Sequence, residues 1–296
     1  AAHVPSIVGG DADLGGSTKT VLKDSPKVAR GKFEGKNLRF GIREHAMGAM
    51  ANGMALYGYF IPYTATFLTF SDYMRPSIRL AALSELPVVH VFTHDSIFLG
   101  EDGPTHQSVE HVSALRTIPH VDVWRPASGI ECAAAWTAAA SRRDGPSELI
   151  FTRQKVDELP AHTVKDAQRG GYVLVRETGA EPEVVFLATG SEVGLAVAAA
   201  KALASDGVRA RVVSLPCLEV FSRQDSAYRD SVLPAKGRRV SIEAGRTELW
   251  RGWVGEDGLT IGVDRFGASA PAKVLAEELG LTPAKVTARV RAWLKG

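Results

Sequence analysis

The chain has 296 residues and a mass of 31.6 kDa, a length typical of about two domains. Its 35 Lys and Arg residues nearly balance its 33 Asp and Glu residues. The formal charge of +2 gives no single-sign field of the kind that binds nucleic acid or an anionic membrane. No apolar run approaches the roughly 18 residues of a membrane span, and the first residues lack the pattern of a signal peptide. Cys132 and Cys217 lie far apart without metal-like spacing, so we expect a cytoplasmic protein. From the charge balance and the absence of a long apolar run, we expect neither nucleic-acid nor membrane partners.

The first glycine-rich segment, GGDADLGGST at 9 to 18, has the composition of an ordinary loop. The segment from Glu44 to about Tyr57 is rich in Ala and Met and predicts a helix that carries Gly48 and Gly53. Because each internal glycine lowers helix propensity by about 1 kcal/mol, we expect close packing to compensate. Two arrangements fit: this helix crosses its symmetry mate in a dimer, or it is buried within one domain.

Three aromatic residues, Phe67, Phe70 and Tyr73, follow at intervals of three. They share one side if the segment turns like an α-helix or a 3₁₀-helix. Such a stripe packs in a core more often than it binds a ring-shaped ligand.

Short apolar or β-branched runs then alternate with Ala-rich stretches, as at 88 to 93 and 148 to 152. This alternation predicts βαβ units around a parallel sheet. The pattern restarts after the polar stretch at 157 to 171, which is either a linker or a long surface loop. We therefore predict an α/β fold with two domains, residues 1–160 and 161–296, each a mainly parallel sheet flanked by helices.

Six of the eight histidines lie between residues 45 and 120, which raises the question of a metal site. The stretch lacks a matched ligand set and both cysteines lie elsewhere, so we assign no metal ligand. His90 suits a hydrogen-bonded position in the core. His94 ends a predicted strand and His106 lies in the following loop, and the ends of strands are where open α/β sheets bind ligands.

Several of these segments occur together in one known family. GIREHAMGAM at 41 to 50 and FLGEDGPTHQ at 98 to 107 flank the aromatic stretch, and RPASGIEC, the Arg153-Gln154 pair, ATGSEV and IGVDRFGASAP follow. In this combination the chain resembles the transketolase family over almost its whole length. The resemblance implies a pyrimidine-binding domain of the thiamine-diphosphate-binding type, followed by a transketolase C-terminal-like domain.

Transketolase-like enzymes hold thiamine diphosphate between two domains, and one of these has no counterpart here. The sequence has no GDG segment followed by a downstream Asn, the type of motif that supplies magnesium ligands. We therefore expect the ligands of Mg²⁺ or another divalent cation in a missing N-terminal domain or a separate N-terminal subunit. Because the sequence begins at Ala1 and directly enters a motif, we interpret it as a fragment or a processed product.

The resemblance also implies which residues contact the cofactor. Glu44 hydrogen-bonds the pyrimidine ring and promotes the imino tautomer that removes the thiazolium proton, a role that needs a carboxyl group shielded from water. The three aromatic residues form a wall against the ring, and Asp13 contacts the cofactor. Two alternatives remain for Glu44: partnership with the helix dipole, or a salt bridge with Arg43 that lowers its proton affinity.

The substrate-binding residues implied by the resemblance are Ser17, His94, Asp102, His106 and Arg153. Ser17, His94 and Arg153 contact the sugar phosphate, Asp102 binds a hydroxyl near the donor carbonyl, and His106 hydrogen-bonds the reacting oxygen atoms. A positioned imidazole stabilises charge that develops on oxygen, so His106 joins Glu44 as a catalytic residue. Ordinary alternatives are a surface salt bridge for Arg153 and turn formation for the loop around Asp102.

The implied activity is transfer of a two-carbon ketol unit between phosphorylated sugars by a homodimer in the pentose phosphate pathway, with this chain alone inactive. Alternatives are a related thiamine-dependent enzyme, the C-terminal subunit of a split transketolase, or a non-catalytic regulatory module. In the second domain we assign no catalytic role to Ser191, Glu192 or Glu243. They suit a helix cap, an early-helix acid and a strand-end carboxylate.

Overall fold

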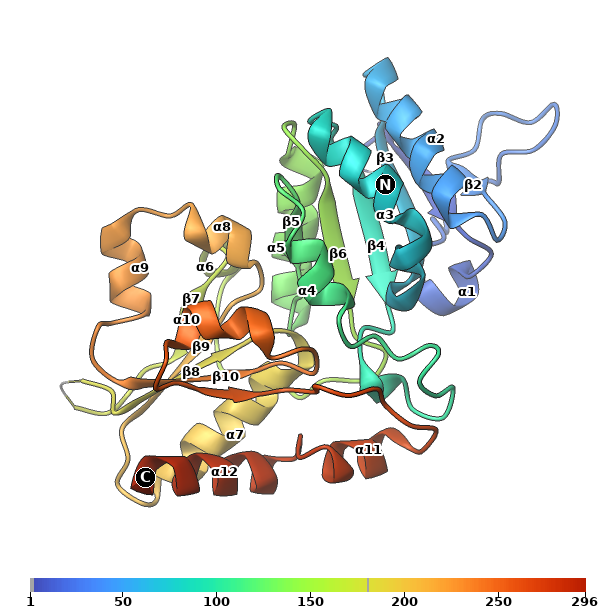
Figure 1. The fold of residues 1–296 in the computed structure, drawn as a ribbon. Coiled ribbons are helices and arrows are strands. Elements are labelled where there is room, and N and C mark those ends of the chain that lie inside the picture. The colour runs from blue at the N-terminus through green and yellow to red at the C-terminus, as the bar shows by residue number, and fades with distance from the viewer. Residues whose placement is uncertain (1–2, 180) are drawn as a thin grey trace.

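The apolar runs of the first half form a six-stranded parallel sheet, ordered β2-β1-β3-β4-β6-β5, in the computed structural model (Figure 1). The structure describes residues 3–179 and 181–296. The strands of this sheet are β1 (Ile7–Asp11), β2 (Asn37–Arg39), β3 (Ile61–Phe67), β4 (Val89–Thr93), β5 (Asp122–Trp124) and β6 (Ser147–Phe151).

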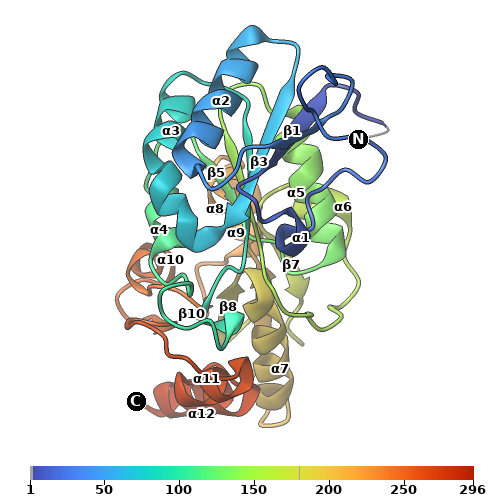
Figure 2. The ribbon, with the colours of Figure 1, turned by 90° about the vertical axis from the view of Figure 1, so that its right-hand side faces the viewer.

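Helices cover both faces of this sheet, which explains why its central strands are buried on both sides. Figure 2 shows α2, α3 and α4 on one side of the sheet and α5 on the other. The helical elements are α1 (Gly15–Thr18), α2 (Glu44–Tyr57), η1 (Leu68–Phe70), α3 (Ser71–Leu83), η2 (Ile97–Leu99), α4 (His111–Arg116) and α5 (Gly129–Ser141).

The second half forms a five-stranded sheet, ordered β11-β10-β8-β9-β7. Its pairs are parallel except that β7 runs antiparallel to β9, so both sheets are mainly parallel and the predicted two-domain α/β fold is confirmed. The strands are β7 (Tyr172–Val175), β8 (Val184–Ala188), β9 (Ala210–Ser214), β10 (Arg238–Ile242) and β11 (Leu259–Ile261).

Two layers of helices enclose the second sheet. Residues of α7 and α12 pack in one apolar cluster with β8 and β10, while α8 and α9 contribute to a cluster on the opposite face. The helical elements are α6 (Val164–Ala167), η3 (Gly190–Glu192), α7 (Val193–Ala204), α8 (Leu218–Ser222), α9 (Ser226–Val232), η4 (Glu248–Trp250), α10 (Arg251–Val254), α11 (Ala272–Glu278) and α12 (Pro283–Lys295).

The polar stretch at 157 to 171 carries the chain from β6 to β7 and contains the one-turn helix α6. Thr163 and Asp166 form a capping box at the start of α6, so this stretch is locally ordered. The division at residue 160 stays a prediction. Within the described residues, no helix combines the length and the apolar character needed to cross a lipid bilayer.

The two glycines of α2 have different surroundings. A Cβ at Gly48 would collide with the hydroxyl of Ser77 on α3, whereas a Cβ at Gly53 would meet no atom within 4 Å. Gly48 therefore permits close packing inside the first domain. Gly53 lies on the outward side of the helix, where no neighbour within the described chain requires a glycine.

Candidate active site

Most of the expected site residues lie at one edge of the first sheet. Because its strands are parallel, their carboxyl ends gather at that edge, where open α/β sheets bind ligands. Asp13 follows β1, Phe67 ends β3, His94 follows β4 and Arg153 follows β6. Two cavities lie among these strand ends.

The first cavity has a volume of about 560 Å³ and contains every residue expected to bind the cofactor, together with His106. Glu44 is the first residue of α2 and only 8% exposed. Arg43 donates from Nη1 to the carbonyl of Phe40 at 3.0 Å, and the described ion pairs do not join it to Glu44. The expected alternative of an Arg43 salt bridge is therefore wrong. The lining comprises Ala12, Asp13, Leu14, Ile42, Glu44, Phe67, Phe70, Tyr73 and His106.

The aromatic residues form a continuous wall although they belong to three different elements. Phe67 ends a strand, Phe70 lies in η1 and Tyr73 lies in α3. The rings of Phe67 and Phe70 are stacked at 6.0 Å and 7°, and Tyr73 is tilted against Phe70 at 6.1 Å. His106 meets Phe70 edge-on at 5.6 Å. The rings lie together, as the three-residue spacing predicts. They do so because the chain turns from β3 through η1 into α3, and not because they share one helix.

The second cavity, of about 850 Å³, brings together the three residues expected to contact a phosphate. Ser17 in α1, His94 after β4 and Arg153 after β6 all line it. The lining also includes residues that the sequence did not indicate, such as Lys19 and Trp136. Asp102 is exposed and lines neither cavity. Its negative charge nevertheless raises the pKa of His94.

His94 lines the second cavity and contacts Phe67, which lines the first. Its ring stacks on Phe67 at 3.8 Å, and its Nδ1 lies 2.8 Å from the hydroxyl of Thr93. Burial lowers the pKa of His94 below its usual 6.5, and the positive charge of Arg153 lowers this pKa further, against the opposing effect of Asp102. The backbone of His94 is left-handed, with φ of 60°, a conformation that residues other than glycine rarely adopt.

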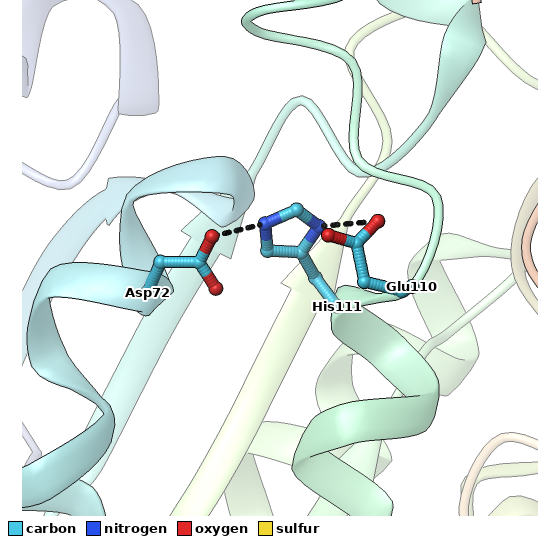
Figure 3. A group of neighbouring side chains, drawn as sticks. All are labelled: Asp72, Glu110 and His111. Carbon is cyan, nitrogen blue, oxygen red and sulfur yellow. Dashed lines mark hydrogen bonds and ion pairs between the residues drawn. The ribbon is translucent and has the colours of Figure 1, made fainter. Parts of the chain in front are cut away.

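His90 and His111 occupy structural positions outside these cavities. His90 is fully buried in β4 and pairs with the hydroxyl of Thr64 at 2.7 Å, as expected for a core histidine. His111 joins α3 to α4, with Nε2 3.1 Å from Asp72 and Nδ1 3.8 Å from Glu110 (Figure 3). The three side chains of this cluster lie close enough to hold a metal ion, but each ring nitrogen faces a different carboxylate.

A buried charge network joins the two domains, and no sequence motif predicts it. Arg125 contacts Asp95 in the first domain and Glu192 in the second, and all three are almost fully buried. Arg116 makes a bidentate pair with Glu243 at 2.8 and 2.9 Å. Burial alone would raise the pKa of Glu243, but Arg116 and Arg125 lower it to about 2. Ser191 lies in η3 and donates to Glu192, so the expected Ser191 cap of α7 is wrong.

The comparisons with known proteins agree with the two-domain α/β fold. The family model described as the transketolase pyrimidine-binding domain matches residues 1–158, and that of the transketolase-like C-terminal domain matches residues 170–282. The chain belongs to the transketolase family.

Individual relatives match nearly all of the chain. The chromosomal transketolase of Cupriavidus necator is 54% identical over 294 residues, which are 99% of this chain and 43% of the relative. A transketolase from Pichia stipitis in complex with sedoheptulose-7-phosphate has a TM-score of 0.94 at 40% identity, covering 99% of this chain and 44% of that one. The chain thus spans less than half the length of these relatives.

A third comparison involves a protein of similar length. A split-gene transketolase, described as an inactive beta4 tetramer, is 26% identical with a TM-score of 0.77. The match covers 99% of this chain and 93% of that chain. A polypeptide that corresponds to nearly all of this chain, and to little more, therefore exists as a separate protein chain.

Proposed function

We propose that this chain forms the pyrimidine-binding and C-terminal part of a transketolase. The complete enzyme transfers a two-carbon ketol unit from a ketose phosphate to an aldose phosphate, using thiamine diphosphate and a divalent cation. The observation that carries the proposal is the single cavity in which Glu44, the aromatic wall and His106 meet. Glu44 and His106 are the catalytic residues.

The first cavity suits the pyrimidine ring of the cofactor but not its diphosphate. Aromatic and aliphatic side chains suit a flat ring, and Glu44 offers it a shielded carboxyl group. Among the described lining residues there is no Lys, Arg or Asn to grip a diphosphate or complete a metal site. These groups belong to the N-terminal domain of the complete enzyme or to a separate N-terminal subunit.

Each residue of the site has a distinct task in this proposal. When bound, thiamine diphosphate supplies the carbanion chemistry that cleaves and forms the carbon–carbon bond. Glu44 holds a proton at a ring nitrogen, and Phe67, Phe70 and Tyr73 orient the ring while Asp13 borders it. Protein contacts at this ring matter because a misplacement of about 1 Å reduces a reaction rate by about a hundredfold.

The substrate occupies the region between the two cavities. Ser17, His94 and Arg153 hold its phosphate, because a hydroxyl, an imidazole and a planar guanidinium converge on the second cavity. Asp102 hydrogen-bonds a substrate hydroxyl near the donor carbonyl. His106 stabilises charge on the reacting oxygen atoms.

We further propose that the complete enzyme is a homodimer whose contact surface includes α2. Large apolar side chains at and just beyond the end of this helix are exposed: Leu56 by 69%, Tyr57 by 68% and Tyr59 by 76%. Exposed apolar patches of this kind mark interaction surfaces.

Both cysteines are free thiols, which suits the reducing cytoplasm.

Calorimetric titration of thiamine diphosphate with magnesium, first into the 296-residue chain, tests the division of the site. We expect no tight, metal-dependent binding to the chain alone. Addition of an N-terminal transketolase domain should restore tight binding and ketol transfer to an aldose phosphate. Tight binding to the chain alone would contradict the division, and binding without ketol transfer after restoration would favour a related thiamine-dependent enzyme or a regulatory module.

A further inference from the structure

The loop from His94 to Glu110 carries most of the proposed substrate contacts, and it lies against the second domain. Figures 1 and 2 both place this loop, coloured teal, beside α11. Ile97 and Val109 are buried in the apolar cluster formed mainly by the second domain, and Phe98 packs against the same cluster. The loop therefore belongs to the first domain by sequence but to the second domain by packing.

The side chain of Gln107 ties this loop to the second domain. It is 3% exposed, and its Nε2 donates to the carbonyl of Gly100 at 2.7 Å and to that of Ala268 at 2.9 Å. The first bond closes the loop on itself, and the second joins it to the segment between β11 and α11. Gln107 immediately follows His106, so displacement of this amide would also move the imidazole.

The segment around Ala268 fits the loop closely at two further points. A Cβ at Gly267 would collide with the side chain of Gln107, and a Cβ at Gly103 would collide with the hydroxyl of Ser269. Gly103 also has a φ of 83°, a conformation that glycine adopts most readily. The two backbones are therefore matched in shape as well as joined by hydrogen bonds.

Both ends of the loop are also linked to the second domain, the first of them through Arg125. At the start, Arg125 donates from Nε and Nη2 to Asp95 at 2.9 and 2.7 Å, and from Nη1 to Glu192. At the end, the backbone N–H of Arg246 donates to the carbonyl of Val109 at 3.1 Å.

We infer that the second domain is the template that fixes the conformation of the loop from His94 to Glu110, with Gln107 as the positioning residue for His106. Gln107 does not line either cavity, so it acts through its neighbour. The catalytic part of this inference rests on the proposed function. The structural part, that Gln107 restrains the loop, does not.

Hydrogen–deuterium exchange of the 296-residue chain tests the structural part. Gln107→Met keeps the length of the side chain but removes both donated bonds, and we expect amide exchange in residues 100–108 to accelerate by about tenfold or more. The matched control is Gln224→Met, which removes a partly buried amide that donates to Val220 within the second domain. The control should leave exchange in the loop unchanged.

Two results would overturn the inference. One is unchanged exchange in the loop of Gln107→Met, and the other is an equal acceleration throughout both domains. If Gln107→Met does not fold, Gln107→Glu provides the test because it retains the shape of the side chain. Protonation of this carboxyl at low pH restores one donor, so excess exchange in the loop over the unsubstituted chain should diminish as the pH falls. A pH-independent excess would contradict a role for the donated bonds.

Kinetics in the enzyme with its N-terminal domain restored test the catalytic part. We expect Gln107→Met to lower kcat by roughly 10- to 100-fold, as for a displaced catalytic group, while KM for the phosphorylated acceptor changes less than about threefold. Loosened exchange with unchanged kcat would reject the positioning of His106. Absence of ketol transfer in the restored unsubstituted enzyme would instead reject the proposed function and leave the exchange result standing.

Discussion

His90 and Glu148 lie directly opposite each other in the neighbouring strands β4 and β6, and both are completely buried. His90 Nδ1 pairs with Thr64, but His90 Nε2 and both carboxylate oxygens of Glu148 have no hydrogen-bond partner in the described structure. Burial lowers the pKa of His90 to about 3 and raises that of Glu148 well above 4.5. His90 is therefore neutral in the folded protein near neutral pH, and burial favours the neutral form of Glu148.

The raised pKa of Glu148 predicts a specific dependence of stability on pH. Above about pH 4.5 the unfolded chain releases the Glu148 proton while the folded chain retains it, so this group destabilises the fold as the pH rises. Glu148→Gln removes this effect. Its stability relative to the unsubstituted chain should increase by up to about 1.4 kcal/mol per pH unit until the folded carboxyl group ionises.

Urea unfolding between pH 5 and pH 8 measures this difference. His90 acts in the opposite direction, because its lowered pKa reduces stability as the pH falls below 6.5, but it is present in both proteins. The exposed Glu278 provides a control, since Glu278→Gln should follow the unsubstituted chain at every pH. Parallel curves for Glu148→Gln would show that the Glu148 carboxyl group ionises normally.

The buried network between the domains predicts a large loss of stability for Arg125→Met. This substitution leaves the carboxylates of Asp95 and Glu192 buried without their common partner, which costs about 3 to 5 kcal/mol. Arg291→Met is the control, because Arg291 and Asp206 form an exposed pair that contributes less than about 1 kcal/mol. Equal free energies of unfolding for both variants would refute the importance of the network.

The glycines of α2 predict opposite effects of the same substitution. Gly48→Ala should destabilise the chain by about 1 to 3 kcal/mol, because the added methyl group overpacks the contact with Ser77. Gly53→Ala should stabilise it by up to about 1 kcal/mol, because its surroundings are open and alanine favours the helix. Thermal unfolding of the two variants compares these effects. A stabilising Gly48→Ala would show that α2 and α3 pack less closely than the approach of Gly48 to Ser77 indicates.

The shielded carboxyl group at the start of α2 predicts a loss of catalysis without a loss of fold. In the restored enzyme, Glu44→Gln should reduce cofactor-dependent turnover by about 10²- to 10⁴-fold, the usual contribution of general acid–base catalysis. Circular dichroism should remain unchanged. The exposed Glu34 provides a control, since Glu34→Gln should retain full turnover. Near-normal turnover of Glu44→Gln would exclude the proposed proton-holding role.

The sequence predicted elements whose signals are local. The helix expected from Glu44 to about Tyr57 has these same bounds in the structure, and the apolar run at 88 to 93 contains β4. Arg153, His94 and Ser17 line one cavity, as the family motifs indicated, although their contacts with substrate stay predictions. Such features depend on short periodic patterns or on motifs of a few residues.

The contacts between domains lie beyond such reasoning. The sequence suits Glu192 to the role of an early-helix acid, yet its partner Arg125 lies 67 residues earlier in the chain. Gln107 is the last residue of the FLGEDGPTHQ motif, and nothing in that motif predicts its hydrogen bond to Ala268, 161 residues away. No local pattern distinguishes an exposed carboxylate or amide from a buried one, because the difference is made by distant segments that fold against it.

The order in which the chain is synthesised gives the Arg125 network a consequence for folding. N-terminal domains generally fold first during translation. When β4 and β5 have formed, Arg125 has Asp95 beside it, but the residues that carry Glu192 follow later. The turn that holds His94 therefore gains its full set of charged partners only when the second domain docks. We therefore expect the substrate side of the site to reach its final conformation only after the second domain has folded.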